Sequence, residues 1–448
     1  MNTDYFNYRP QKFYLLSAKA RKLLSFASDD KSLENAVEEA FAKLPKVEGG
    51  NVYAIFRYEP MMLKVMMELS DRFKDKYSCI QSLPSFMRQL EEGDVFIRHQ
   101  AWATLPDLKR SMIKLKAIIE GRDMNRDDTT FMLNWTRLYL KYDTFSYGFL
   151  TDRIYVGEED RDKRECRFCH NKGDERFRHE SHAMMEALGN KLLFCNEECD
   201  ECNQILEGSV EKQLFKFLEI QRTLSNVPGK KRKHHYLEGE NFHIRPDLTT
   251  NKPVVYVKQE TIINDIYKGR ATGQILLFNK GDISYYGIYK ALVKIAIDMM
   301  PTEHYAHFKD AGSWVCGAKK GGNLSTFLYG EHDDFFEQPE IDLFFRKSES
   351  PHFSPYCIAV IYIYCSIFIF TVPFCDLDDD SSNSTTSLKA CYDFFKKYQY
   401  LYIAEWVEYD ANDKTPRKPF YKSYILPQGA PYKIVFKPST DEVFKRER

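Results

Sequence analysis

The amino-acid sequence predicts an α+β fold, and three observations lead to this class. The chain has 448 residues, the length of about three ordinary domains. Residues 1–150 carry apolar positions at helical spacing, whereas residues 211–448 alternate strand-like apolar runs with one clear helix. Between them, residues 151–210 contain two close pairs of cysteines. We therefore expect a mainly helical N-terminal domain, a small central module and an α+β C-terminal domain.

The composition is that of a globular protein without a strong overall charge. Hydrophobic residues make up 43% of the chain and charged residues 29%, which excludes disordered, collagen-like and disulfide-scaffold proteins. The 64 Lys and Arg residues nearly balance the 65 Asp and Glu residues, so the formal net charge is −1. A nucleic-acid partner would therefore have to bind a local basic patch.

Two features bear on the cellular compartment. The N-terminal sequence MNTDYFNYRPQKFYLL lacks the apolar core of a signal peptide and the Arg- and Ser-rich pattern of a transit peptide. The 11 cysteines are an odd number, and four of them lie in two close pairs, which favours metal binding over disulfides. We expect a cytoplasmic protein with reduced thiols.

The uncharged segment Tyr356–Phe374 (YCIAVIYIYCSIFIFTVPF) is long enough to cross a bilayer. However, it contains no Leu, is rich in Ile, Tyr, Phe and Val, and has Pro373 near its end. These residues favour buried strands. Acidic residues follow the segment, where a transmembrane helix usually has a Lys/Arg-rich flank. We expect buried sheet, as one long strand or two short ones, and no membrane partner.

The N-terminal domain is predicted from apolar stripes and one strand. The stripes lie at Leu33–Leu44, Met61–Leu69, Leu108–Ile119 and Met132–Leu140, and the strand is Val52–Phe56. The Met-rich second stripe is either core or a binding surface, and its helical spacing favours core. Because this domain shows no catalytic signature, we expect a sensor or partner-binding role for it.

The C-terminal domain begins with a predicted helix, Val210–Leu224, and a basic loop at residues 230–235. The cations of the loop are Lys230, Lys231, Arg232 and Lys233. They either contact nucleic-acid phosphates or form a solvated loop. Further on we expect strands at Val254–Val257 and Ile275–Phe278, and a helix whose apolar face runs from Ile288 to Met299.

The central module contains two Cys-x-x-Cys pairs. Cys166 and Cys169 form the first pair, Cys199 and Cys202 the second, and residues 170–198 separate them. Four thiolates in two short-spaced pairs suit a closed tetrahedral zinc site. Such a site is structural, because no coordination position remains for water, and it stabilises a segment too small for a core of its own. The other cysteines, including Cys195, are expected to be packing residues.

The residues between the pairs add a second motif. The sequence Glu180-Ser181-His182 leads into AMMEALGN, and Asn203 directly follows the last cysteine. This stretch resembles the HNH endonucleases, in particular the bacterial branch with a Cys-x-x-Cys pair, a motif close to E-[AS]-H-x-x-x-E-x-L-G-N and a closing ECDECN. The resemblance covers Cys166–Leu206 and continues weakly to the sequence YYGIYKALVKIAIDMMP. Residues 1–150 resemble no family.

The resemblance implies a ββα-metal fold and assigns roles to several residues. His182 would be the general base that takes a proton from the attacking water. Asn203 would bind a catalytic Mg²⁺ or Mn²⁺ ion, which neutralises the phosphate. Glu207 lies one helical turn further and would be a second ligand or bind through water. The plainer alternatives are a core histidine for His182 and a helix cap for Asn203.

The sequence departs from the family pattern in two places. Many HNH enzymes have a metal-binding Asp or His directly before the base, where this chain has Ser181. Glu180 would share a strand face with His182 and either bind the metal or orient the ring. Met185 stands where many relatives have Pro. The asparagine that orients the base is either Asn190 or Asn196, and His179 is expected to be an exposed or capping residue.

Together these features predict a metal-dependent HNH endonuclease that hydrolyses DNA. Its architecture resembles bacterial restriction or antiphage-defence effectors, which implies DNA as partner and allows a partner subunit or a homo-oligomer. One alternative is a non-catalytic zinc module that binds nucleic acid or a protein, which Ser181 favours. The other is a toxin-like nuclease that acts on RNA.

Overall fold

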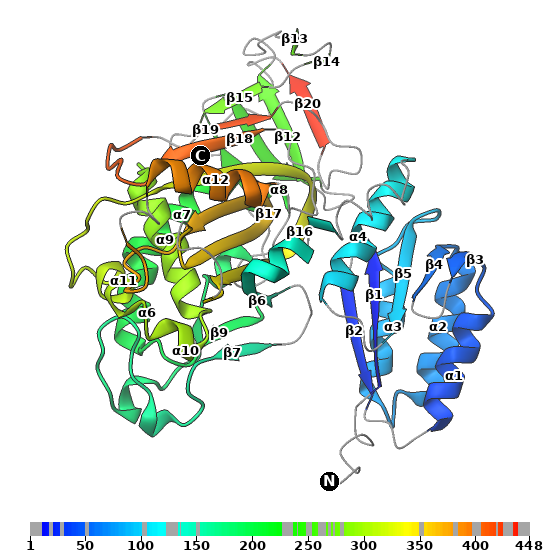
Figure 1. Ribbon diagram of the computed structural model, residues 1–448. Helices are drawn as coiled ribbons and strands as arrows, with labels where there is room; N and C mark the ends of the chain where they lie inside the picture. The colour runs from blue at the N-terminus through cyan, green and yellow to red at the C-terminus, as the bar shows by residue number, and fades with distance from the viewer. Residues whose placement is uncertain are drawn as a thin grey trace, which may run out of the picture. The chain divides into compact units, whose positions relative to one another are not determined.

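In the computed structural model, the chain forms two compact units (Figure 1). The described residues are 11–17, 21–26, 31–49, 53–100, 105–121, 133–134, 136–148, 153–225, 236–239, 241–247, 253–258, 266–267, 270–271, 274–277, 282–348, 354–379, 384–396, 405–417, 420–423 and 433–437. The N-terminal unit comprises the described residues up to 140, and the C-terminal unit comprises the rest.

The N-terminal unit is a five-stranded antiparallel sheet with helices on it. The strands follow the order β2-β1-β5-β4-β3. The elements are β1 (Gln11–Ser17), β2 (Arg21–Phe26), α1 (Lys31–Ala42), β3 (Lys46–Gly49), β4 (Tyr53–Arg57), α2 (Pro60–Phe73), η2 (Ser78–Gln81), α3 (Ser82–Met87), β5 (Val95–Gln100) and α4 (Leu105–Glu120). The expected helices are present, but they accompany a sheet of which four of the five strands were not expected.

Two of the missed strands, β1 and β5, lack alternation because both of their faces are buried. The neighbouring residues Leu15 and Leu16 of β1, and Phe96 and Ile97 of β5, are all buried. A strand that is covered on both sides reads as a continuous apolar run, which periodicity cannot distinguish from a helix. The Met-rich stripe of α2 is core as expected, with Met62 and Met66 completely buried.

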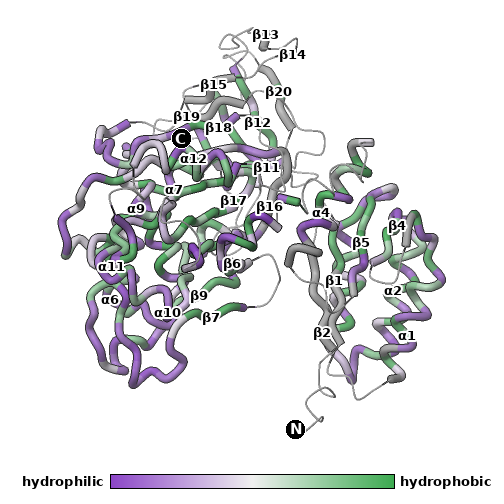
Figure 2. The backbone as a smooth tube through the Cα atoms, viewed as in Figure 1, coloured by the Kyte–Doolittle hydropathy of each residue, from purple (hydrophilic) through white to green (hydrophobic). Residues whose placement is uncertain are grey.

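The C-terminal unit is built around two long strands, β16 (Thr326–Arg346) and β17 (Cys357–Thr371). They pair antiparallel, and the other edge of β16 pairs with β18 (Trp406–Asp410) at one end and β6 (Tyr142–Tyr147) at the other. Every residue of β17 is buried, and its apolar run is visible in Figure 2. The prediction of a buried strand for this segment is confirmed.

Helices explain why β17 has no polar face. On one side Tyr289 of α9 (Tyr285–Asp298) contacts the rings of Phe327 and Phe370, with centroids 6.0 and 6.1 Å apart. On the other side Phe395 of α12 (Thr385–Lys396) lies 4.9 Å from the ring of Phe344. The sheet is therefore a central layer. Among the described residues, no helix is long and apolar enough to cross a membrane.

The remaining elements of the C-terminal unit are short. They are β7 (Ile154–Val156), η3 (Arg161–Lys163), η4 (Asp174–Arg176), β8 (Ser181–His182), η5 (Glu186–Leu188), β9 (Leu193–Cys195), α6 (Asp200–Leu206), the π-helical turn η6 (Glu207–Glu211), α7 (Lys212–Phe217), α8 (Glu219–Leu224), β10 (Leu237–Glu238), β11 (Phe242–Pro246), β12 (Pro253–Lys258), β13 (Ile266–Tyr267), β14 (Arg270–Ala271), β15 (Gln274–Leu277), α10 (Thr302–Tyr305), α11 (Lys309–Val315), β19 (Phe420–Ser423) and β20 (Lys433–Lys437). The expected helix at Val210–Leu224 thus forms successive helical segments, and both expected strands are present.

The cysteine-rich segment is not separated from the C-terminal region. Its apolar residues, such as Phe168 and Leu193, belong to one continuous core with Leu292 of α9 and Phe370 of β17. Residues 153–396 accordingly fall within one compact unit. The structure thus differs from the expected boundary near residue 210, because the short segments of the module bury their apolar side chains against α9.

A buried network of charges fixes this segment to α9. The Arg167 guanidinium pairs with Glu197 at 2.7 Å and donates to the carbonyls of Ile297 and Met300, each at 2.6 Å. These carbonyls lie at and just beyond the C-terminal end of α9, where helical carbonyls lack intrahelical partners. Arg167 lies between the first two cysteines, so one side chain joins the turn to the helix end.

Lys294 forms the second centre of the network. Its ammonium lies 3.0 Å from Glu198, 3.2 Å from Glu211 and 2.8 Å from Asp298. The ammonium is fully buried, and the three carboxylates hold the pKa of Lys294 well above its usual range despite that burial. Burial, followed by the charge of Glu198, raises the pKa of Asp298. The network therefore keeps the Lys294 ammonium charged in the core and favours the protonated form of the Asp298 carboxyl group.

Replacement of Lys294 by Met should destabilise the protein strongly. The change would leave buried carboxylates without their cation, which costs about 3–5 kcal/mol. Lys290→Met is the matched control, because Lys290 lies one turn earlier on α9, is half-buried and forms no ion pair among the described residues. Urea unfolding of both variants tests this, and equal free energies of unfolding would contradict it.

Glu211 should give stability a pH dependence. Burial raises the pKa of Glu211 from 4.5 to about 7. Between these values the folded state holds a proton that the unfolded state releases, so stability falls as pH rises through this window, by up to about 3 kcal/mol. Glu211→Gln should reduce the loss of unfolding free energy between pH 5 and pH 8. Glu207→Gln, at an exposed residue, should leave this loss of unfolding free energy unchanged. If Glu211→Gln shows the same loss as the wild type, Glu211 is not its source.

Candidate metal centre and candidate active site

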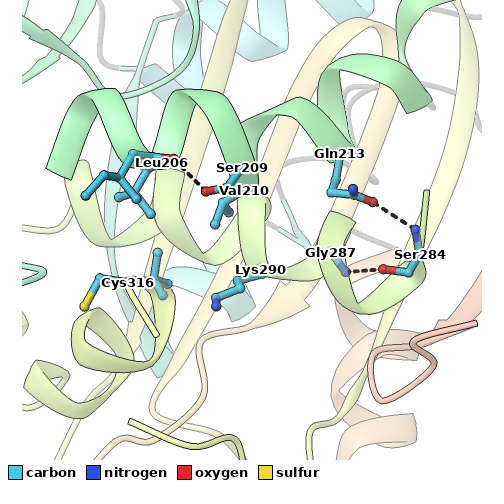
Figure 3. A pocket seen from close by; sticks show the side chains of 10 residues that line it. Leu206, Ser209, Val210, Gln213, Ser284, Gly287, Lys290 and Cys316 are labelled. Atoms are coloured by element: carbon cyan, nitrogen blue, oxygen red, sulfur yellow. Dashed lines mark hydrogen bonds between the residues drawn. The ribbon is translucent and has the colours of Figure 1, made fainter. Parts of the chain in front are cut away.

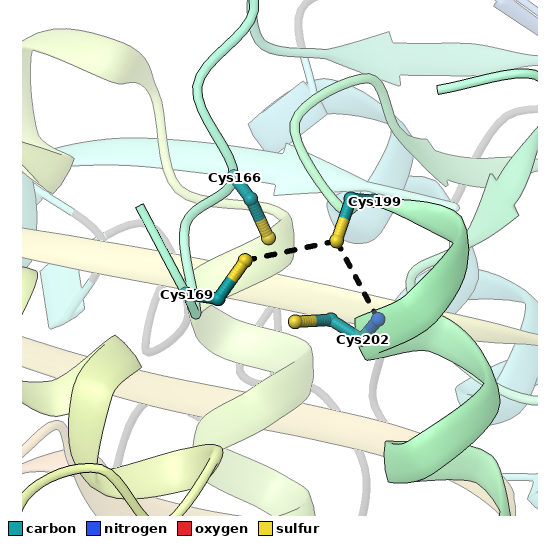
Figure 4. Close-up of side chains that lie close together, drawn as sticks. All are labelled: Cys166, Cys169, Cys199 and Cys202. Atoms are coloured by element: carbon teal, nitrogen blue, oxygen red, sulfur yellow. Dashed lines mark hydrogen bonds between the residues drawn. The ribbon is translucent and has the colours of Figure 1, made fainter. Parts of the chain in front are cut away.

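Four cysteines, two from a turn and two from the start of α6, converge in the C-terminal unit (Figure 4). The sulfur atoms of Cys166, Cys169, Cys199 and Cys202 all lie within 4.8 Å of one another, and those of Cys169 and Cys199 are 3.8 Å apart. Tetrahedral Zn–S bonds of about 2.3 Å give sulfur–sulfur edges of about 3.8 Å. The predicted convergence is confirmed: the four cysteines lie within reach of one metal ion, an arrangement consistent with zinc.

A tight turn shapes the first cysteine pair. His170, directly after Cys169, has a left-handed φ of 59°, and its N–H donates to the Cys166 carbonyl at 2.9 Å. The turn lies so close to α11 that a Cβ on Gly312 would be 2.0 Å from the Arg167 carbonyl oxygen. Glycine at this position is what allows the turn to pack against the helix.

The second pair lies at the start of α6. Cys199 is the N-cap of this helix, and its sulfur accepts a hydrogen bond from the Cys202 N–H at 3.5 Å. Hydrogen bonds from the thiols of Cys166 and Cys202 lower the pKa of Cys199. Thiols must lose their protons to bind a metal, and the positive end of a helix favours the thiolate.

The predicted base, His182, lies in a row of rings across the sheet β7-β9-β8. Tyr155 pairs with Phe194 in the parallel ladder, and His182 pairs with Phe194 in the antiparallel one. The ring of Phe194 lies 4.9 Å from Tyr155 and 4.6 Å from His182. All three side chains therefore share one face of the sheet.

The environment of His182 favours its neutral form. The side chain is half-buried, and burial lowers the pKa of His182 below its usual value of 6.5, although Glu186 and Glu180 act in the opposite direction. Its Nδ1 atom is buried and has no hydrogen-bond partner in the described part of the chain. The imidazole is thus unprotonated at neutral pH, as a general base must be.

The residues before His182 point to opposite sides. Glu180 accepts a hydrogen bond from the Tyr155 hydroxyl at 2.8 Å, and it lies 3.7 Å from Arg153. It is therefore next to the ring row, on the side that the strand pattern predicted. Ser181 is buried and donates to Glu198 at 2.5 Å. The Lys294 ammonium also donates to the His182 carbonyl at 3.3 Å, so a buried cation lies behind this strand.

The predicted ligands of a catalytic ion lie on the helix after the cysteines. Asn203 is half-buried on α6, and the N–H of Glu207 donates to its carbonyl, which keeps the two residues one helical turn apart. No described contact joins either side chain to His182. Within the described ranges, no second group of three or more His, Cys, Asp or Glu ligands accompanies the cysteine cluster. The described contacts therefore do not link the predicted base to the predicted ligands.

Asn190 organises the loop between β8 and β9. Its amide nitrogen donates to the carbonyls of Met184 and Leu193 at 2.9 and 2.8 Å, and its oxygen accepts from the Leu193 N–H at 2.9 Å. Asn190 thus holds the backbone after His182 and does not contact its ring. Asn196 borders a small hollow beside Tyr155.

Other predicted site residues have simpler environments. His179 is exposed and pairs with Asp200 at 3.1 Å, as an exposed or capping residue would. The basic residues Lys230, Lys231, Arg232 and Lys233 lie outside the described residues. Cys195 is buried on β9, as expected of a packing residue.

A second hollow, of about 260 Å³, lies between α6–η6–α7 and α9 (Figure 3). Its lining includes Ser209, Gln213, Lys290 and Cys316. Burial lowers the pKa of Lys290. Sequence reasoning missed this hollow and the buried network. The sequence did contain a signal for the buried network: Lys294 and Asp298 are opposite charges four residues apart within the otherwise apolar run ALVKIAIDMM.

Comparison with known proteins gives no match from family models, curated proteins or solved structures. The HNH resemblance therefore rests on the motif between Cys166 and Leu206.

The cysteine cluster should carry one zinc ion per chain. Cys202→Ser should lose the bound zinc, because it removes one of four thiolates, and should unfold at lower temperature. Cys316→Ser is the control, since Cys316 is half-buried and outside the cluster. Elemental analysis of the purified protein, with and without prior treatment with a chelator, measures the number of zinc ions per chain. A wild-type chain that holds no zinc, or a Cys202→Ser chain that keeps it, would overturn the assignment.

Proposed function

We propose that the protein is a metal-dependent endonuclease of the HNH type that hydrolyses DNA phosphodiester bonds. The observation that carries the proposal is the position of His182. A histidine kept neutral by burial lies on β8 beside β9, and the chain leaves β9 directly into the four-cysteine cluster and α6. Two antiparallel strands followed by a helix are the order of elements that the resemblance implies.

In the proposed reaction His182 accepts the proton of a water that attacks phosphorus. Lys294 and Asn190 hold the backbone at and just after His182. The Lys294 ammonium donates to the His182 carbonyl, and the Asn190 amide donates to the Met184 carbonyl. Glu180 lies beside the ring row and favours the protonated imidazole that forms, since its charge acts on His182. These contacts fix the base without contacting its reactive ring.

The proposed metals have different roles. Zinc at the four cysteines would be structural, because four thiolates leave no position for water. Asn203 and Glu207 would hold Mg²⁺ or Mn²⁺, which suits a few oxygen ligands completed by water and phosphate and would neutralise charge on the phosphate.

A second function is favoured by Ser181 and Lys294. Ser181 stands where many HNH enzymes have a metal ligand. Here its side chain is buried and donates a hydrogen bond to Glu198, and the Lys294 ammonium lies on the inner side of the strand. These contacts favour a zinc module that binds nucleic acid without cleaving it. Such a module would bind DNA in the presence of every divalent ion and never cut it.

His182→Ala should abolish cleavage of plasmid DNA while zinc content stays unchanged. The expected loss is about 10²–10⁴-fold, the usual contribution of a general base. Nicking and linearisation are measured with purified protein in Mg²⁺, Mn²⁺ and EDTA, with RNA as a competing substrate. His179→Ala is the matched control, since this exposed histidine pairs with Asp200.

The pH profile gives an independent check. Because burial lowers the pKa of His182 below 6.5, the base becomes half-protonated only below that pH, and the acid limb of the cleavage rate should lie there as well. Cleavage that His182→Ala leaves intact would refute the role of His182. Binding without cleavage in every ion would select the non-catalytic module, and preference for RNA would replace the DNA assignment.

A further inference from the structure

Tyr155 extends the ring row to the edge of the sheet. β7 is the outer strand in the order β7-β9-β8, and the Tyr155 ring stacks on Phe194 with an interplanar angle of 17°. The only ring contact described for Tyr155 is on this side, and 42% of the residue is exposed. Its outer face is thus a flat aromatic surface at the edge of the sheet, and Phe194 lies between this ring and the candidate base.

Three arginines lie near this ring, together with Glu180, which binds the Tyr155 hydroxyl and pairs with Arg153. The Arg153 guanidinium lies 5.4 Å above Phe194 and 3.4 Å from the Tyr155 hydroxyl. A hollow of about 170 Å³ next to Tyr155 is bordered by Arg161 and Arg164. Arg164 is held by the carbonyls of Glu158 and Glu159. Arg161 is exposed and forms no ion pair in the part of the chain that the structure describes.

From these observations we infer that Tyr155 is a stacking site for an unpaired base of single-stranded DNA, with Arg161 and Arg153 as contacts for the adjacent phosphates. The inference rests on the proposed DNA substrate and specifies its class. Bases inside a duplex are already stacked on their neighbours, so a ring face can bind only a base that has left the duplex. Arginines beside an aromatic face match the alternation of phosphate and base along a single strand.

The position of Tyr155 gives the site a consequence for cleavage. Tyr155 and His182 contact opposite sides of the same Phe194 ring. A strand whose base stacks on the outer face of Tyr155 would therefore have to continue across the Phe194 ring to reach the imidazole. The hydroxyl of Tyr155 binds Glu180 and contributes to the position of the ring, whereas the ring itself provides the stacking surface.

The test is direct binding of a short fluorescent oligonucleotide, measured by anisotropy without added Mg²⁺ or Mn²⁺. Tyr155→Ala and Tyr155→Leu should weaken single-strand binding about tenfold, because stacking contributes a factor of this order per base. Tyr155→Phe should bind within about twofold of wild type, since it keeps the ring. The Leu variant keeps apolar bulk, so its loss of affinity would not follow from packing alone. Tyr139→Ala, at an exposed tyrosine of the N-terminal unit, is the control.

A second readout does not depend on the folding of any variant. Photo-crosslinking of a halogenated pyrimidine oligonucleotide to the wild-type chain should label Tyr155, as identified by mass spectrometry. Equal affinities of wild type, Tyr155→Ala and Tyr155→Leu would overturn the inference, as would the same loss for duplex DNA or labelling elsewhere. Stronger Tyr155-dependent binding of single-stranded RNA would overturn the choice of DNA.

The outcomes separate this inference from the proposed nuclease activity. Tyr155-dependent binding by a chain that never cuts DNA would support the stacking site and reject the activity. Cleavage that depends on His182, together with binding that ignores Tyr155, would support the activity and reject the stacking site.

Discussion

Two buried cations connect the cysteine-rich segment to α9. Arg167 pairs with Glu197 and binds carbonyls at the end of the helix, and Lys294 lies between three carboxylates. The elements of the segment are only a few residues long, so they cannot form a core alone. Charges held in the core are expensive to separate from their partners, and they define one orientation of the segment on the helix. The metal centre and the ring row both depend on that orientation.

The same network shapes the chemistry of the strand that carries His182. Lys294 binds the carbonyl of His182 from inside, and Ser181 is held on Glu198. The inner side of the strand is thus occupied by a structural ion pair, and only the outer side, with His182, Tyr155 and Glu180, is available to a substrate. In the proposed function, a nucleic acid would therefore approach the side of the strand opposite Lys294.

The metal centre and the ring row serve different purposes in this arrangement. The cysteines fix the beginning of α6 against the turn after Cys166, in the way that a closed sulfur site stabilises a small fold. The ring row offers a neutral imidazole and an aromatic face on neighbouring strands. In the proposed function, different residues of the same short segment thus provide structural stability and substrate contact.

The sequence by itself determined the parts that depend on local spacing. The two Cys-x-x-Cys pairs predicted the cluster of four cysteines, the Ile-, Tyr- and Phe-rich run predicted β17, and helical spacing predicted α2 and α9. Only the tertiary structure decided what depends on contacts between distant residues. The N-terminal strands buried on both faces carry no alternation, and the partners of Lys294 at Glu198 and Glu211 are far away in the chain. The row of Tyr155, Phe194 and His182 exists because three strands align in register, and register is a property of pairing that spacing along one strand does not contain.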